Sequence, residues 1–299
     1  MQALEPRGHM GHTVKFDTPQ EEKIFLEDVQ SEHFMKRRFG QGVKVCSYDT
    51  SKIDWDGAIR QLLVEKGICT DKQMRDLDNL SNLHTILTGD WTTLGEDELN
   101  KVSKAFYDNN DAFDRIYRRF IKEVVTADCG EPVWWQKTPT MRFHFPNQKG
   151  FNWKPRYHTD IMLGHPPQEV NVWVALTDVY GTNSMCLGGF ESSYSTLKTL
   201  GFDFEDFATK VQYDDAFAAR CADFIRPLEL KYGEYVMFDP RCIHATQNNK
   251  TEHTRISIDL RVLPQGERPR MRIDYRGTGR LRMLFAPGHY YDERLSTEL

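Results

Sequence analysis

The sequence predicts a mainly β protein, a sandwich or barrel of short strands, preceded by a helical first half. Two observations predict this fold class. After Cys129, short runs of β-branched and aromatic residues alternate with Gly, Pro and Asn, as in many short strands joined by turns. Before Cys129, apolar residues recur at spacings of three and four, which is the period of a helix. The length of 299 residues suits one large domain or two small ones.

The helical half contains three clear apolar stripes. One consists of Ile59, Leu62 and Leu63 and is expected to end at Gly67, and a second consists of Leu99, Val102 and Phe106. The third stripe starts after Asp111, a residue that can cap a helix. It comprises Phe113, Ile116, Tyr117, Phe120, Ile121 and Val124, with charged residues on the opposite face. We interpret these apolar residues as core.

Eight strands are expected in the second half, and a helical segment from Thr196 to Phe224 interrupts them. The strands are expected near Thr140–Phe145, Arg156–Asp160, Glu169–Leu176, Met185–Phe190, Leu228–Leu230, Tyr235–Phe238, Ile243–Thr246 and Thr254–Leu263. This pattern divides the chain into a helical scaffold at residues 1–130, a β core at 131–265 and an extension at 266–299, within one compact domain. Residues 1–10 contain a stretch that resembles a protease-site remnant, so they are left out of the fold prediction.

Composition excludes several classes of function. Charged residues make up 28% of the chain and the net charge is −5, without a basic cluster of the kind that binds nucleic acid. No apolar run approaches the roughly 20 residues that a membrane-spanning helix needs. The six cysteines form no Cys-x-x-Cys pair and no secretory signal is visible, so reduced thiols and a cytoplasmic location are expected.

Strict alternation marks the segment from Arg255 to Val262. Its Ile, Leu and Val residues share one face, and Arg255, Ser257, Asp259 and Arg261 share the other. The polar face either meets solvent, as is common in antiparallel sheets, or lines the lumen of a barrel that holds a polar ligand. Arg142 with His144, and Glu169 with Asn171 and Trp173, repeat the pattern on other strands, which favours the lumen.

His158-x-Asp160 is a candidate pair of metal ligands, because residues i and i+2 of a strand point to the same side. Composition alone supplies roughly one such pair in a chain of this kind, so the pair is weak evidence. A facial triad for non-haem Fe(II) needs a second histidine from elsewhere in the chain. His244 is the candidate, because it follows a turn and a strand, while His165 and His253 are rivals.

Arg255 lies eleven residues after His244, and Ser257 faces the same way. A guanidinium group suits the distal carboxylate of a dicarboxylate, and a hydroxyl can add a hydrogen bond. Alone, Arg255 is as easily a partner in a structural ion pair. The order His-x-Asp, a distant His, then Arg-x-Ser is far more specific than any of its parts.

With these residues in place, the sequence resembles the Fe(II)- and 2-oxoglutarate-dependent oxygenases of the phytanoyl-CoA dioxygenase-like superfamily, in particular the streptomycin-biosynthesis type. The resemblance spans about residues 141–263. It rests on Arg142–Pro146, His158–Asp160, His165–Trp173, Gly181–Ser184, Gly233-Glu234, His244 and Arg255–Arg261.

The resemblance implies a double-stranded β-helix, that is, a cupin-like jelly roll, flanked by N-terminal helices. It implies that His158, Asp160 and His244 bind Fe(II), that Arg255 and Ser257 anchor 2-oxoglutarate, and that O₂ is the oxidant. Related halogenases carry a small residue in place of the Asp, so Asp160 favours hydroxylation. Cys186-Leu187-Gly188-Gly189 departs from the bulkier polar residues expected in that strand, which leaves the substrate class open.

The candidates for the substrate pocket share a polar or aromatic side chain on a predicted lumen face. They are Arg142, His144, Asn171, Trp173, Asn183 and Arg261. So polar a lumen favours a small polar metabolite of specialised, antibiotic-type biosynthesis. Three alternatives stay open at this point: a cupin metalloenzyme that is not an oxygenase, a metal-free jelly-roll binding protein, and a scaffold that dimerises through its helices. The pair Arg255 and Ser257 argues against the first, because such an enzyme has no dicarboxylate to anchor.

Overall fold

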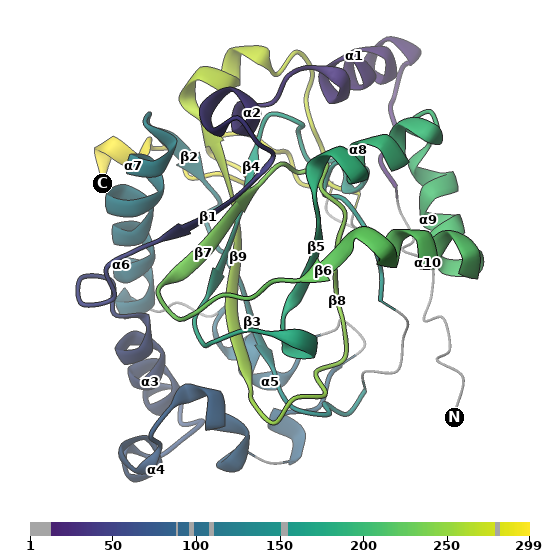
Figure 1. The fold of residues 1–299 in the computed structure, drawn as a ribbon. Coiled ribbons are helices and arrows are strands. Elements are labelled where there is room, and N and C mark those ends of the chain that lie inside the picture. Colours follow the sequence, from purple (N-terminus) through teal and green to yellow (C-terminus); the bar gives the residue numbers. More distant parts are fainter. Residues whose placement is uncertain (1–12, 88, 96–98, 108–110, 151–154, 279–281) are drawn as a thin grey trace.

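Two antiparallel sheets form the centre of the molecule in the computed structural model (Figure 1), which describes residues 13–87, 89–95, 99–107, 111–150, 155–278 and 282–299. The larger sheet has the strand order β1-β7-β4-β9-β2, and β3 also pairs with β9; the smaller has the order β6-β5-β8. The strands are β1 Val43–Ser47, β2 Val133–Trp135, β3 Thr140–His144, β4 Val170–Ala175, β5 Met185–Gly188, β6 Ile225–Pro227, β7 Glu234–Phe238, β8 His244–Thr246 and β9 Arg255–Pro264.

The chain alternates between the sheets as a jelly roll does. From β3 in the large sheet it passes the short bridge between His158 and His244 beside the small sheet, and returns to the large sheet as β4. It then forms β5 and β6 in the small sheet, β7 in the large, β8 in the small and β9 in the large. The predicted double-stranded β-helix is confirmed.

Strand β9 explains how the sheets enclose a polar space. Its apolar residues, among them Ile256 and Ile258, pack outward into the same core as the N-terminal helices. Its polar residues point inward, and Arg255 and Ser257 there are buried. The alternation therefore reflects a lumen and not a solvated face. A shift of β9 by one residue would turn its apolar side chains inward and its polar side chains outward, so the register determines which side chains reach the interior.

The helices cover the outside of the sheets. The α-helices are α1 Pro19–Gln30, α2 Phe34–Phe39, α3 Trp55–Glu65, α4 Asp71–Asp76, α5 Lys101–Ala105, α6 Asp111–Phe120, α7 Thr126–Cys129, α8 Phe190–Thr199, α9 Phe204–Tyr213 and α10 Asp215–Phe224. A π-helical turn, Ile121–Val125, joins α6 to α7. Short 3-10 turns span Leu80–Thr85, Gly89–Trp91, Ile161–Leu163, Gly181–Asn183, Gln265–Arg270 and Ser296–Glu298. Helices α3 and α6 pack on the large sheet, whereas α8–α10 lie beside the small sheet (Figure 1).

Two strand predictions were wrong. Residues Arg156–Asp160 form no strand: only His158 makes a bridge, and Asp160 has helical backbone angles before the turn Ile161–Leu163. The strand expected at Leu228–Leu230 lies earlier, at Ile225–Pro227, and Leu230 only bridges Val179. Strands β1 and β2 were not predicted, and β1 lies within the half that was expected to be helical.

The structure bears on the expectations about cysteines and membrane spans, but not on those about the first ten residues and the domain division. All six cysteines are free. No helix among the described residues combines the length and the hydropathy needed to span a membrane. The stretch that resembles a protease-site remnant falls at residues 1–10, outside the described residues, and this interpretation stays a prediction. The division of the chain at residues 130 and 265 stays a prediction.

Candidate metal and cosubstrate site

His158 and His244 are brought together by their backbones. The amide of His158 donates to the carbonyl of His244 at 3.0 Å, and the reverse bond is 2.9 Å. The two imidazole centroids lie 4.2 Å apart. A mutual bridge of this kind places both side chains on one side, so two histidines distant in sequence become neighbours.

Both imidazoles are oriented in the same way. Nδ1 of His158 donates to the carbonyl of Arg156 at 2.9 Å, and Nδ1 of His244 donates to the carbonyl of Cys242 at 3.0 Å. Because a carbonyl only accepts, the proton resides on Nδ1 and the Nε2 lone pair remains available. A metal-binding histidine commonly shows this arrangement, with its second nitrogen held by a backbone carbonyl.

Asp160 completes a group whose ligand atoms all lie within 4.8 Å of one another. Its Oδ1 is 3.6 Å from Nε2 of His244. Its Oδ2 accepts from Nε and Nη2 of Arg261, at 2.9 and 2.6 Å. One carboxylate oxygen is thus held by Arg261, while the other faces the histidines.

Protonation in this cluster suits a cation. Burial lowers the pKa of His158 to about 3, and neighbouring His244 contributes in the same direction, so His158 is neutral at neutral pH. Burial alone would raise the pKa of Asp160, but the charge of Arg261 and the neighbouring histidines together outweigh it, and the pKa falls well below its usual range. Two imidazoles and one carboxylate are the donor set of a facial non-haem Fe(II) site.

A second group of possible ligands shares Asp160 with His165 and Glu169. Here Nδ1 of His165 is 2.6 Å from Oε1 of Glu169, and Oε2 of Glu169 accepts from the hydroxyl of Tyr291 at 2.7 Å. Nδ1 of His165 and Oε1 of Glu169 are thus within ion-pair distance, although neither atom has a hydrogen bond, while Oε2 of Glu169 is held by Tyr291. The first group fits a facial Fe(II) site better, because it has two histidines and one carboxylate.

Arg255 and Ser257 carry buried polar atoms that lack a protein partner. The Nη1 atom of Arg255 donates to the carbonyl of Asn183 at 3.2 Å, but its Nε atom and the Oγ atom of Ser257 have no hydrogen bond. Buried groups of this kind usually find a partner, so a ligand is expected here. The guanidinium and hydroxyl match a carboxylate, as 2-oxoglutarate requires.

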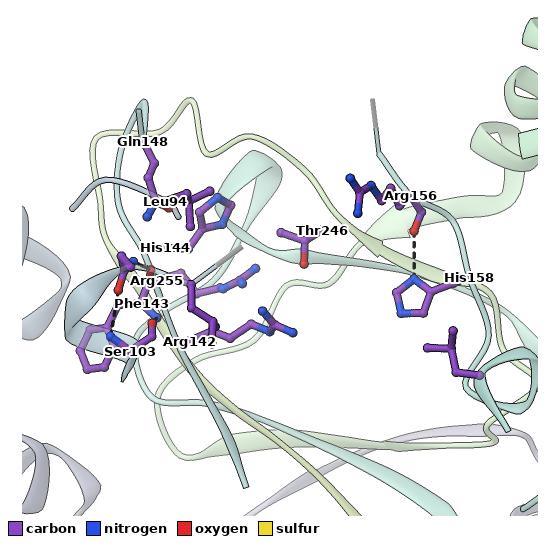
Figure 2. A pocket seen from close by; sticks show the side chains of 13 residues that line it. Leu94, Ser103, Arg142, Phe143, His144, Gln148, Arg156, His158, Thr246 and Arg255 are labelled. Carbon is purple, nitrogen blue, oxygen red and sulfur yellow. Dashed lines mark hydrogen bonds between the residues drawn. The ribbon is translucent and has the colours of Figure 1, made fainter. Parts of the chain in front are cut away.

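A cavity of about 220 Å³ opens beside these residues (Figure 2). The described residues that line it are Leu94, Leu99, Asn100, Ser103, Arg142, Phe143, His144, Gln148, Arg156, His158, Leu163, Thr246 and Arg255. Figure 2 shows Arg142 and Arg255 pointing from one wall toward the space before His158 and Arg156. A metal held by His158 would therefore be reached from this cavity.

The predicted substrate residues separate into two groups. Arg142 and His144 line the cavity, whereas Asn171, Trp173, Asn183 and Arg261 are not among its described lining residues. Trp173 lies under the Arg255 guanidinium, 5.9 Å from ring centre to Cζ, and Asn183 offers its carbonyl to the same group. Their positions indicate support of the anchor, and contact with substrate stays a prediction.

Sequence reasoning missed several residues near the site. His165 was considered only as a rival ligand, and Glu169 and Tyr291 were not considered as its partners. Glu169 is fully buried within a run that otherwise reads as an apolar strand, and a buried acid in such a run was the available signal. Arg156, which lies beside the metal-ligand candidate His158, also lines the cavity.

Similarity to known proteins agrees with this geometry. A family model described as Phytanoyl-CoA dioxygenase (PhyH) matches residues 84–257. The streptomycin biosynthesis protein StrG of Streptomyces griseus is 27% identical over 219 residues, which cover 73% of this chain and 83% of that protein.

Solved structures also show similarity to this chain at low identity. The non-heme alpha ketoglutarate dependent carbocyclase SnoK from nogalamycin biosynthesis is 14% identical with a TM-score of 0.44, covering 84% of this chain and 85% of its own. EctD from S. alaskensis with bound Fe is 13% identical with a TM-score of 0.46, covering 88% and 82%.

The family match includes every metal-ligand candidate and both cosubstrate-anchor candidates, since residues 84–257 contain His158, Asp160, His244, Arg255 and Ser257. The match covers more than half of the chain. Fe(II) and 2-oxoglutarate are accordingly the cofactors of this protein. The chain therefore belongs to the phytanoyl-CoA dioxygenase (PhyH) family, and it is an enzyme of the 2-oxoglutarate-dependent oxygenase superfamily.

Proposed function

We propose that the protein hydroxylates a small polar metabolite, with Fe(II) held by His158, Asp160 and His244 and with 2-oxoglutarate anchored by Arg255 and Ser257. The observation that carries the proposal is the convergence of two free Nε2 atoms and one carboxylate oxygen within 4.8 Å at the edge of a cavity. Bound iron with 2-oxoglutarate and O₂ supplies the oxidation of an unactivated C–H bond, while the cosubstrate loses CO₂ to give succinate.

The residues of the chain perform the binding and the positioning. The carbonyls of Arg156 and Cys242 fix the imidazole planes, and Arg261 fixes the plane of Asp160. Burial of the site excludes bulk water, which protects a reactive site from side reactions. Asp160 keeps a carboxylate at the position where a halogenase would need room for a halide, which supports hydroxylation.

Two observations support a small polar substrate. The cavity of about 220 Å³ is lined by side chains that include Arg142, His144 and Gln148, so a long acyl chain would meet polar groups along its length. The similarity to a protein of streptomycin biosynthesis supports a place in specialised metabolism. An amino acid, a sugar or an aminocyclitol fits both observations.

The test is an anaerobic titration with Fe(II) and 2-oxoglutarate, followed by the weak visible charge-transfer band of the chelate. The parent is expected to show the band, His244→Ala to lose it, and Arg255→Ala to require much more 2-oxoglutarate. His289→Ala, at an exposed histidine, serves as the control and should match the parent. A parent that binds iron but never develops the band would overturn the proposal.

A further inference from the structure

Arg142 is a cation without a counter-ion in the cavity. It lies on β3, opposite Ser257 of β9, so both side chains face the lumen. It is half-buried, and no hydrogen bond or ion pair joins its guanidinium to any residue within the described part of the chain. The described residues that line the cavity include no Asp or Glu. A guanidinium held away from bulk water without a carboxylate is costly unless a ligand supplies one.

Among the arginines that the large sheet places in the lumen, Arg142 is the one left without an anionic partner. A divalent metal and the dianion 2-oxoglutarate cancel each other. Arg261 bonds both Asp160 and Asp259, and the latter contact, from Nη1 to Oδ1, is 2.7 Å. Three guanidinium groups, those of Arg142, Arg255 and Arg261, then face two carboxylates. Counted over these groups alone, the site with metal and cosubstrate bound therefore retains one positive charge. Arg142 carries it into the cavity, which Arg156 also lines.

The neighbouring anchor responds to this charge. The pKa of Arg255 falls to about 9, mainly because the side chain is buried and secondly because Arg142 is close. Two like charges on adjacent strands, facing one enclosed space, repel each other until anions arrive. Arg255 and Ser257 together offer what one distal carboxylate needs, so 2-oxoglutarate leaves the Arg142 guanidinium available.

We propose that the substrate of this enzyme carries an anionic group, a carboxylate, phosphate or sulfate, and that Arg142 binds it. The inference rests on the proposed function, because it assigns 2-oxoglutarate to Arg255 and Ser257. It narrows the substrate class from polar metabolites to acidic ones. His144 and Gln148, which line the same wall, add polar groups beside Arg142.

Sulfate and acetate are suitable probes, because they present the anionic group without the rest of a substrate. Protein loaded anaerobically with Fe(II) and saturating 2-oxoglutarate is titrated with each probe by calorimetry at constant ionic strength. The charge-transfer band is recorded in the same samples. Parent, Arg142→Gln and Arg142→Lys are compared with Arg115→Gln, which alters an exposed arginine on α6.

The parent and Arg115→Gln are expected to bind one anion while the band persists. Arg142→Gln is expected to bind it at least ten-fold more weakly, and Arg142→Lys to fall between because it keeps the charge but not the planar fork. In succinate-release screens with matched acids and primary amides, the parent should favour the acid, and Arg142→Gln should lose that preference.

Two results would overturn the inference. Equal anion binding by all four proteins would show that Arg142 is not the site. Displacement of 2-oxoglutarate by the probe, together with 2-oxoglutarate binding weakened as much in Arg142→Gln as in Arg255→Gln, would assign Arg142 to the cosubstrate. A parent without any charge-transfer band contradicts the proposed function itself, which is a different outcome from a normal band without Arg142-dependent anion binding.

Discussion

Arg261 joins two carboxylates at one end of β9. Its Nε and Nη2 atoms hold Oδ2 of Asp160, its Nη1 atom holds Asp259, and only 8% of its surface is exposed. A planar fork with this many engaged donors fixes the carboxylate plane as well as its charge. From the sequence, Arg261 was a candidate for substrate contact; its geometry supports a role in positioning the candidate metal ligand Asp160 instead.

Replacing Arg261 by Gln is therefore expected to weaken binding of Fe(II) by about 10- to 100-fold, which is the usual effect of losing a group that orients a metal ligand. Arg261→Lys should recover part of the affinity, because it restores the charge without the fork. Anaerobic calorimetry with Fe(II) measures both. Arg294→Gln, in a pair with Asp292 nearer the surface, is the control. Unchanged affinity in Arg261→Gln would refute the positioning role.

Ser257 offers a second prediction at the level of single atoms. Its Oγ atom is buried without a partner, and we expect it to donate to the distal carboxylate of 2-oxoglutarate. A hydrogen bond to a charged group contributes about 1.5–3 kcal/mol, so Ser257→Ala should raise the Kd for 2-oxoglutarate by roughly ten-fold or more. The charge-transfer titration gives the Kd directly. Ser192→Ala, exposed on α8, should leave the Kd unchanged, and a matching Kd in Ser257→Ala would exclude the contact.

Residue type and order predict the candidate metal ligands, but they do not predict which side chains hold them. His158, Asp160 and His244 can be proposed because few residue types bind iron and their spacing is informative. The partner of Asp160 cannot, because Arg142, Arg255 and Arg261 all lie on lumen faces and look alike in one dimension. Only the three-dimensional path of the loop after His158 decides which of them Asp160 reaches.

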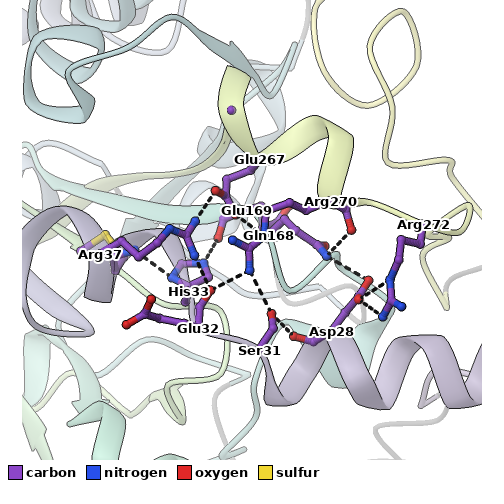
Figure 3. A network of polar contacts seen from close by, with 12 residues as sticks. Asp28, Ser31, Glu32, His33, Arg37, Gln168, Glu169, Glu267, Arg270 and Arg272 are labelled. Atoms are coloured by element: carbon purple, nitrogen blue, oxygen red, sulfur yellow. Dashed lines mark hydrogen bonds and ion pairs between the residues drawn. The ribbon is translucent and has the colours of Figure 1, made fainter.

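Helix α2 is tied to the interior by its N-cap residue, His33. Its Nδ1 atom accepts from the amide of Met35 at 3.1 Å, and its Nε2 atom donates to the carbonyl of Glu169 at 2.7 Å. Figure 3 shows this side chain within the polar network that connects the N-terminal helices to the segment before β4. The cap works only with a neutral ring, because protonation of Nδ1 removes its acceptor.

Stability should consequently depend on the charge state of His33. Burial lowers its pKa from 6.5 to about 4, despite the nearby carboxylate of Asp239. The folded pKa is below the unfolded one, so the contribution is complete above pH 6.5 and is lost as the pH falls from 6.5 toward 4. The loss is about 3 kcal/mol. It is measurable by urea unfolding of metal-free protein across this range.

The control for this effect is His33→Gln, which can retain both hydrogen bonds but cannot titrate. Its free energy of unfolding should fall less steeply between pH 6.5 and 4.5 than that of the parent. Identical pH profiles for the two proteins would show that His33 does not carry the effect.

Elements with a long regular pattern are those that the sequence predicts well. Strand β9 and helices α3 and α6 each repeat their pattern over two turns or several strand positions. Strand β2 has three residues and β1 is an edge strand with an exposed Val45, so neither shows a clear alternation. Residues Arg156–Asp160 show the opposite error. The segment has strand-like composition, but the amide of Asp160 bonds the carbonyl of Pro240 and the chain turns there.

At the scale of the whole molecule, the C-terminal segment returns to the centre of the β core. The amide of Asp292 donates to the carbonyl of Trp135 at 2.8 Å, and the Tyr291 hydroxyl reaches Glu169 next to β4. Tyr291 is fully buried although it lies near the end of the chain. Gly164, at φ 91°, lets the tail approach, because a Cβ atom there would lie 2.0 Å from the carbonyl oxygen of Arg276.

Removing the Tyr291 hydroxyl should therefore destabilise the whole fold. Tyr291→Phe leaves the ring in place but takes one donor from the buried Glu169 carboxylate, at a cost of about 1–3 kcal/mol. Urea unfolding measures this change. Tyr213→Phe, at a tyrosine that is 57% exposed, should have no effect. Equal stability of both variants and the parent would mean that Glu169 does not need this donor.

Strand β9 has one further consequence. It carries the proposed cosubstrate anchor at Arg255 and Ser257 and, six positions after Arg255, the arginine that holds the candidate metal ligand Asp160. The proposed anchor for the distal carboxylate and the residue that positions the candidate metal ligand thus lie on one strand. This strand pairs with β3 from Arg255 to Asp259 and with β4 from Ser257 to Val262. A fixed spacing between the two positions would select 2-oxo diacids by length. 2-Oxoadipate, which is one methylene longer, should therefore bind more weakly than 2-oxoglutarate although it presents the same two functional ends.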